Sequence, residues 1–125
     1  MARVIRKVIF TRHAEHDLLD IISWIKDKEG SEAASRFLEK MIQARDNLHH
    51  FPQRGRIPPE LMYINIRTYR EIQVFPYRVI YQVSQMSSQI YIHLVADGRR
   101  NFTELLKNRL LIMPDQIKSG KSSSS

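Results

Sequence analysis

The stretch that decides the fold is residues 69–97, which read YREIQVFPYRVIYQVSQMSSQIYIHLVAD. Three of its segments are rich in β-branched and aromatic residues, which is typical of strands. They occupy residues 69–75, 77–84 and 89–96. The polar link at 85–88 predicts a hairpin loop between the last two. A further strand is expected just upstream, at 63–67, so the sequence predicts an antiparallel meander.

Alternation within these segments predicts which side chains share a face of the sheet. In the middle segment, one face carries Tyr77, Val79, Tyr81 and Val83. Arg78 is therefore expected on the opposite face, in the middle of its strand. In the last segment, the apolar residues expected to share one face are Ile90, Ile92 and Leu94.

Upstream of the meander, the sequence predicts a strand at 3–10 and then two helices. Thr11 offers an N-cap for the first helix, and Gly30 offers a left-handed stop. Its apolar stripe consists of Ala14, Leu18, Ile21, Ile22 and Ile25. Ser31 is expected to cap the second helix, which ends at 51–52. The second stripe consists of Ala34, Phe37, Met41, Ala44 and Leu48. The link between the two helices is very short, which predicts an antiparallel helical hairpin.

Downstream of the meander, Asn101 and Glu104 have the spacing of a capping box for a short last helix. Leu106 lies on the apolar stripe of that helix and is expected to be buried. The predicted class is α+β: an N-terminal strand and an antiparallel helical hairpin packed on an antiparallel sheet, with a short C-terminal helix. One domain is expected at 1–113, followed by a disordered polar tail at 114–125.

Composition limits the possible functions. The 125 residues carry 20 Lys and Arg against 13 Asp and Glu, a formal net charge of +7, which favours an anionic partner. The chain has no cysteine, so thiolate catalysis and cysteine-based zinc sites are excluded. It shows neither an apolar run of membrane-spanning length nor a signal peptide, so we expect a cytoplasmic protein with no membrane partner. No cofactor or metal is expected.

Several arginines flank the predicted strands and form a candidate binding surface. The set expected to contact a target consists of Arg67, Arg70, Arg78, Arg99 and Arg100. Guanidinium groups bind phosphates and carboxylates in bidentate fashion, so such a surface suits either anion. Arg78 has an equally weighted alternative, which is pairing with a structural acid such as Glu71 or Asp97.

Three motifs together resemble the RelE/ParE superfamily of toxins from type II toxin–antitoxin systems. The C-terminal motif runs YREI, YRVIY and DGRRNFTELL; before it come TRHAEHDL at 11–18 and FPQRGR at 51–56. The resemblance spans about residues 4–111 and preserves the order of the motifs. It implies a cognate antitoxin whose flexible, often acidic segment wraps the toxin.

The ribonuclease branch of this superfamily cleaves messenger RNA on the ribosome, using lysines, arginines and a late tyrosine or histidine. Arg78 and Arg100 match its arginines. Tyr69 and Glu71 stand at its lysine positions, and the apolar Leu106 stands at its tyrosine. If the chain is a ribonuclease, the resemblance gives Arg78, Arg100 and Glu71 as the catalytic set, with Glu71 as a general base.

The ParE branch inhibits DNA gyrase by binding it and needs no catalytic set. It matches through REI, YRVIY and GRRN, although Asp97 stands where that branch often has a histidine. Inhibition of gyrase is therefore the first expectation, and ribosome-dependent cleavage of mRNA is the alternative. A third hypothesis is an inactive module that only binds the antitoxin.

Overall fold

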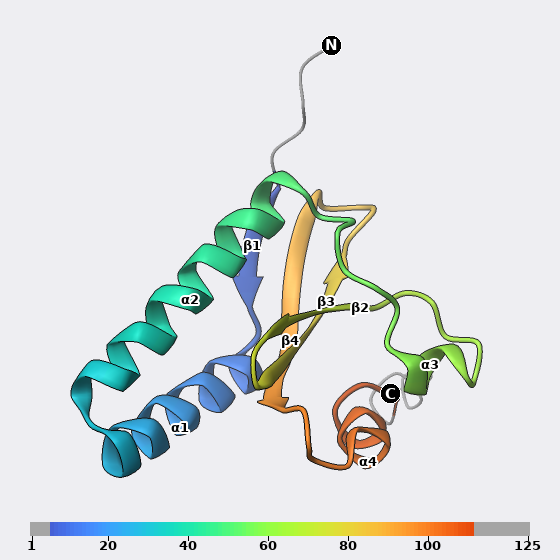
Figure 1. Ribbon diagram of the computed structural model, residues 1–125. Helices are drawn as coiled ribbons and strands as arrows, with labels where there is room; N and C mark the ends of the chain where they lie inside the picture. Colours follow the sequence, from blue (N-terminus) through green and yellow to red (C-terminus); the bar gives the residue numbers. More distant parts are fainter. Residues whose placement is uncertain (1–5, 112–125) are drawn as a thin grey trace.

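The computed structural model describes residues 6–111, which form an α+β fold around one sheet (Figure 1). In chain order the elements are β1 (Lys7–Phe10), α1 (Arg12–Glu29), α2 (Ser31–His50), α3 (Pro59–Met62), β2 (Arg70–Val74), β3 (Tyr77–Val83), β4 (Gln89–Asp97) and α4 (Phe102–Leu106), which continues as the π-helical segment Lys107–Leu111. The predicted tail at 114–125 and the predicted strand residues 3–5 lie outside the described residues.

The sheet has the strand order β1-β4-β3-β2. Strands β2, β3 and β4 form the predicted antiparallel meander. Strand β1 pairs in parallel with β4, with Lys7 opposite Gln89, so the sheet as a whole is mixed rather than purely antiparallel. The hairpin turn of the meander fixes the direction of its strands, whereas the direction of β1 depends on where the two following helices return the chain.

The strand predicted at 63–67 is wrong. Pro58 and Pro59 begin the short helix α3, because proline is well suited to the first helical position. Leu61 is fully buried and anchors this helix in the core. Asn65 then takes a positive φ of 63°, which ends any extended conformation in this segment.

The helical hairpin forms as predicted, with one change at its link. The Thr11 side chain accepts a hydrogen bond from the backbone N–H of Ala14 at 3.2 Å. Gly30 ends α1 with a φ of 99°, where a side chain would be strained. Gly30 also occupies the N-cap position of α2, so Ser31 is the first helical residue and the prediction that it caps the helix is wrong.

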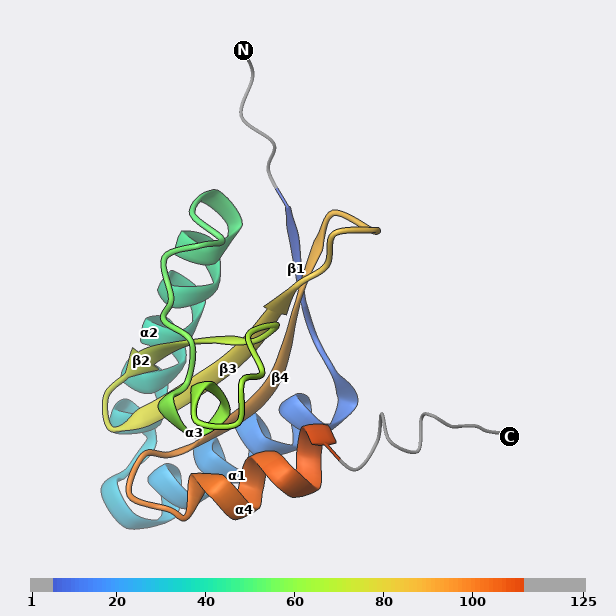
Figure 2. The ribbon, with the colours of Figure 1, turned by 90° about the vertical axis from the view of Figure 1, so that its right-hand side faces the viewer.

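The sheet has a core on each face. The hairpin covers one face, where Phe37 and Met41 pack with Tyr77 and Val79 of β3. Helix α4 lies on the other face, as Figure 2 shows near the end of β4. That second core consists of Leu61, Ile80, Leu94, Ala96, Phe102, Leu106 and Leu110. The predicted burial of Leu106 is confirmed, at 1% exposure.

An irregularity in β4 changes which of its residues face each core. Ile80 of β3 pairs with Leu94 and the next residue pairs with Ile92, so His93 is an extra residue, a β-bulge. Ile92 consequently faces the helical hairpin, whereas Leu94 faces α4. The prediction that these residues share a face is therefore wrong, since a bulge reverses the alternation.

The C-terminal segment is tied to the first helix at this bulge. Asp17 Oδ2 accepts a hydrogen bond from the Val95 N–H at 3.0 Å, beyond the point where β1 ends. The same carboxylate receives both terminal nitrogens of Arg109, at 2.9 and 3.0 Å. Arg109 also donates to the carbonyl of His93 at 2.6 Å.

Within residues 6–111, no helix is both long and apolar enough to cross a membrane.

Candidate functional site

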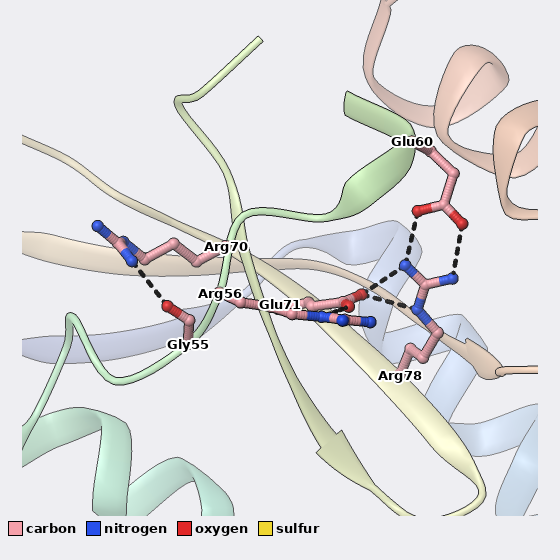
Figure 3. Close-up of polar contacts among 6 residues, drawn as sticks. All are labelled: Gly55, Arg56, Glu60, Arg70, Glu71 and Arg78. Carbon is pink, nitrogen blue, oxygen red and sulfur yellow. Dashed lines mark hydrogen bonds and ion pairs between the residues drawn. The ribbon is translucent and has the colours of Figure 1, made fainter. Parts of the chain in front are cut away.

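Arg78 lies at the centre of a network of four charged side chains (Figure 3). Its guanidinium donates two parallel hydrogen bonds to the Glu60 carboxylate, of 3.0 Å from Nη1 and 2.8 Å from Nη2. Its Nε donates to Glu71 Oε1 at 2.7 Å. The other oxygen of Glu71 accepts from Arg56 Nε at 2.5 Å. Two arginines thus neutralise two glutamates on the face of the sheet covered by α4.

Each member of the network comes from a different element. Alternation along β3 turns Arg78 toward α4, where its guanidinium carbon lies 3.9 Å from the centre of the Phe102 ring. Glu71 comes from β2, opposite Ile80. Arg56 reaches it from the preceding loop, and α3 carries Glu60 to the far side of the guanidinium. The network therefore holds two strands, a loop and a short helix together.

The FPQRGR motif positions the loop that contributes Arg56. Arg56 and Glu71 exchange two backbone hydrogen bonds, of 3.1 and 2.7 Å. The Gly55 N–H donates to the Tyr81 hydroxyl at 2.9 Å, and that hydroxyl donates to the carbonyl of Pro52. A Cβ at Gly55 would lie 2.6 Å from both the Tyr81 hydroxyl and the Glu71 carbonyl oxygen, so only glycine permits this approach.

Burial makes these charges depend on one another. The Glu71 side chain is only 1% exposed and that of Arg78 10%. Burial acts to lower the pKa of Arg78, but hydrogen bonds to Glu60 and Glu71 outweigh it and raise the pKa. The hydrogen bond from Arg78 lowers the pKa of Glu60. Both shifts favour the charged forms of Arg78 and Glu60. Arg78 takes the structural pairing with Glu71 that the sequence left open.

The Gly98 turn holds the two arginines of the GRRN motif at the surface. Arg99 is exposed and pairs with Asp97, with Nη2 at 2.6 Å from Oδ2. Hydrogen bonds from Arg99 lower the pKa of Asp97 to about 2. Arg100 is also exposed, and its guanidinium has no hydrogen bond or ion pair within residues 6–111. Asp97, the second structural acid proposed for Arg78, is thus bound to Arg99 instead.

The two remaining predicted target contacts lie in other surroundings. Arg70 donates to the carbonyl of Gly55 at 2.7 Å. Arg67 is exposed and donates to Asn65 Oδ1 at 3.1 Å. The structure therefore brings Arg78 together with Glu71, and Arg99 together with Arg100, but it does not gather all five arginines into one contact network.

Arg99 and Arg100 line a depression of about 420 Å³ between β4 and α1. Its other wall includes Trp24, whose side chain is half-exposed, and the carboxylate of Asp20. A half-exposed tryptophan beside two arginines is a combination enriched at protein interfaces. Nothing in the local sequence links Trp24 to the GRRN motif, because the two lie together only through the packing of α1 beside the end of β4.

His93 does not supply a positive charge at this site. Burial, and then the charge of Arg109, lower its pKa to about 4. Its Nε2 lies 3.1 Å from Gln82 Oε1, and its ring packs edge-on to Tyr69. No group of three or more potential metal ligands occurs among the described residues.

Sequence reasoning missed two members of the charged network, Glu60 and Arg56. The only local signal for Glu60 was its place just after two prolines, which favours the first turn of a helix. Nothing in the sequence indicates that this turn packs against Arg78. Arg56 lay in a recognised motif, but its pairing depends on the approach of the loop to β2.

Comparison with known proteins identifies the fold and the family. The family model described as the ParE toxin of the type II toxin–antitoxin system parDE matches residues 8–102. The chain is similar in structure to a chain of the chromosomal ParDE system of Pseudomonas aeruginosa, with a TM-score of 0.59 and 18% identity over 74% of this chain and 96% of that chain. It is also similar in structure to a chain of the RelBE2 toxin–antitoxin complex of Mycobacterium tuberculosis. That comparison has a TM-score of 0.53 and 20% identity, and it covers 77% of this chain and 94% of that chain.

A search of curated proteins found no sequence match. At identities this low, the two solved structures support the fold. The family model supports more, because it spans most of the chain, including the loop motif, the meander and the Gly98 turn. The chain therefore belongs to the ParE family of toxins from type II toxin–antitoxin systems.

Proposed function

We propose that this toxin acts by binding and inhibiting DNA gyrase, and that a cognate antitoxin neutralises it. The membership of the ParE family supports the first part, because the ParE branch is the one whose members inhibit gyrase. The antitoxin is supported by the same membership and by the toxin–antitoxin complexes among the structural neighbours.

The single observation that carries the proposal is the closure of the Arg78 network. An mRNA-cleaving toxin needs a cation free to stabilise the scissile phosphate and a base free to reach the 2′-hydroxyl. In Arg78, Nε, Nη1 and Nη2 all donate hydrogen bonds to Glu60 or Glu71. Both oxygens of Glu71 are occupied, and its side chain is buried. Of the three residues suggested for catalysis, only Arg100 is open to solvent.

The surface best suited to contact gyrase is the depression that joins Arg99 and Arg100 to Trp24. It offers two exposed guanidiniums beside a large half-exposed ring. Residues of these types dominate the binding energy of many protein interfaces. An inhibitor that works by binding requires such a surface and no reacting group.

The surface best suited to the antitoxin is the outer side of the helical hairpin. Its large exposed apolar side chains include Leu19, Leu38 and Ile42. An amphipathic segment of the antitoxin can cover such residues, as helices do in apolar grooves.

The experiment adds purified toxin to two assays, gyrase supercoiling and translation on purified ribosomes. We expect inhibition of supercoiling, with messages left intact. The double variant Arg99→Ala/Arg100→Ala should weaken the inhibition by about tenfold or more, the usual effect of losing an interface hot spot. The matched control is Arg12→Ala/Arg36→Ala, which removes the same charge from exposed positions elsewhere.

Two results would count against the proposal. Cleavage of mRNA at stalled ribosomes with supercoiling untouched would replace it by the ribonuclease alternative. Equal potency of the two double variants, both folded, would remove the Gly98 turn from the gyrase contact.

A further inference from the structure

A groove with a volume of about 760 Å³ runs between α2 and the edge strand β2. The loop carrying Arg54 and Arg56 borders it on the third side. Its apolar lining includes Ile72 and the highly exposed ring of Phe75. None of the residues proposed above for the gyrase contact lines this groove.

The backbone of β2 presents unused hydrogen-bonding groups to this groove. Strand β2 lies at the edge of the sheet, with β3 on one side only. Glu71 directs its N–H and carbonyl away from β3, because both bond to Arg56 of the loop. Alternation along an antiparallel strand makes Gln73 point its N–H and carbonyl the same way. The loop has turned away at that point, and neither group has a partner within residues 6–111.

The charge of the groove is positive. Lys40 of α2 and Arg54 of the loop are exposed on opposite sides of it, and neither makes an ion pair within residues 6–111. The only carboxylate in the lining belongs to Glu71, whose oxygens are already taken by Arg56 and Arg78. Two unpaired cations therefore flank an open strand edge and an apolar floor.

We propose that this groove binds an extended acidic segment of the antitoxin, which adds to β2 as a further strand beside Gln73. The inference rests on the proposed toxin–antitoxin function and assigns one partner segment to one edge of the sheet. Backbone bonds to Gln73 set the position of the segment, while carboxylates pair with Lys40 and Arg54. An acidic peptide fits because the edge supplies hydrogen bonds and the two sides of the groove supply charge.

The first test uses the 125-residue toxin and a candidate antitoxin, taken as the product of a small open reading frame adjacent to the toxin gene. Gln73→Pro removes the outward N–H but spares the bonds between β2 and β3, since a proline is tolerated at a strand edge. We expect it to weaken the complex by about tenfold, the loss of one hydrogen bond with added steric conflict. Gln73→Ala keeps the N–H and should bind like wild type.

The second test concerns charge. Lys40→Glu/Arg54→Glu should weaken the complex about tenfold or more at low salt, and the loss should shrink as salt is added. Lys28→Glu/Lys107→Glu makes the same change of charge at exposed positions outside the groove and should bind like wild type. Hydrogen exchange should show the Gln73 amide protected in the complex.

The outcomes separate this inference from the proposed function. If the candidate antitoxin does not bind wild-type toxin, this inference and the antitoxin part of the proposed function are overturned, whereas gyrase inhibition is decided by the supercoiling assay. If it binds and neutralises, but both tested variants bind like their controls and the Gln73 amide exchanges as in free toxin, the groove assignment alone is overturned. Circular dichroism and thermal melting of each variant show that the comparison is made between folded proteins.

Discussion

The guanidinium of Arg78 is held by two carboxylates, and this sets the chemistry available on its face of the sheet. An isolated buried charge would be very costly, but no buried side-chain nitrogen or oxygen among the described residues lacks a hydrogen-bond partner. The neutral cluster is a fixed structural unit, whereas Arg99 and Arg100 remain at the surface. Arg78 is thus enclosed in the structure, whereas Arg99 and Arg100 stay accessible for the contact proposed above.

Removing the Glu71 carboxylate should lower the free energy of unfolding. Glu71→Ala leaves Arg56 without its acid and Arg78 with Glu60 only. We expect the free energy of unfolding to fall by about 3 kcal/mol, the lower end for breaking a buried ion pair. Urea denaturation measures it. Glu104→Ala, at an exposed acid of α4, should cost less than about 1 kcal/mol. Equal small losses would show that the network contributes little.

The partly buried His93 predicts a dependence of stability on pH. Burial lowers its pKa from 6.5 to about 4 in the folded protein, so the unfolded chain binds a proton in this window and the folded chain does not. Stability should therefore fall as pH drops from 6.5 to 4, by about 3 kcal/mol at most. His93→Leu should flatten this part of the profile. A ring that titrates near 6.5 by NMR would contradict the account.

At the scale of elements, local signals predicted the helices and the meander, and non-local packing decided the rest. The α1–α2 hairpin follows from two apolar stripes and Gly30, all readable along the chain. The bulge at His93 and the parallel pairing of β1 are not readable, because both depend on partners distant in sequence. The pairing of Glu71 with Arg78 could be foreseen, because the two residues lie on neighbouring strands of the meander. The pairing of Glu60 with Arg78 could not, because it depends on the position of α3.

The apolar stripe of α4 gives the prediction at this scale. Leu106 is buried against Ile80 and Leu94 in the second core, whereas its neighbour Leu105 is only partly buried. Leu106→Ala should lower the free energy of unfolding by about 2–5 kcal/mol, as for other core leucines. Leu105→Ala is the matched control and should cost less. A melting temperature unchanged by Leu106→Ala would mean that α4 does not pack as described.

At the scale of the whole molecule, the surfaces proposed for the target and for the antitoxin segment are separate. The closed network occupies Arg78 and Glu71, the Gly98 turn holds two arginines beside Trp24, and the groove along β2 is lined by other residues. The net charge of +7 is consistent with partners that carry acidic segments. Under this proposal, the target and the antitoxin segment contact different parts of one small domain.

The central claim, that the target is gyrase, is tested most directly by inducing the toxin in growing cells. DNA synthesis and protein synthesis would be followed in the same culture by pulses of labelled thymidine and methionine. The account predicts that DNA synthesis stops first, while messages stay intact and translation continues for a time. Translation that stops first, with messages cut on the ribosome, would contradict it.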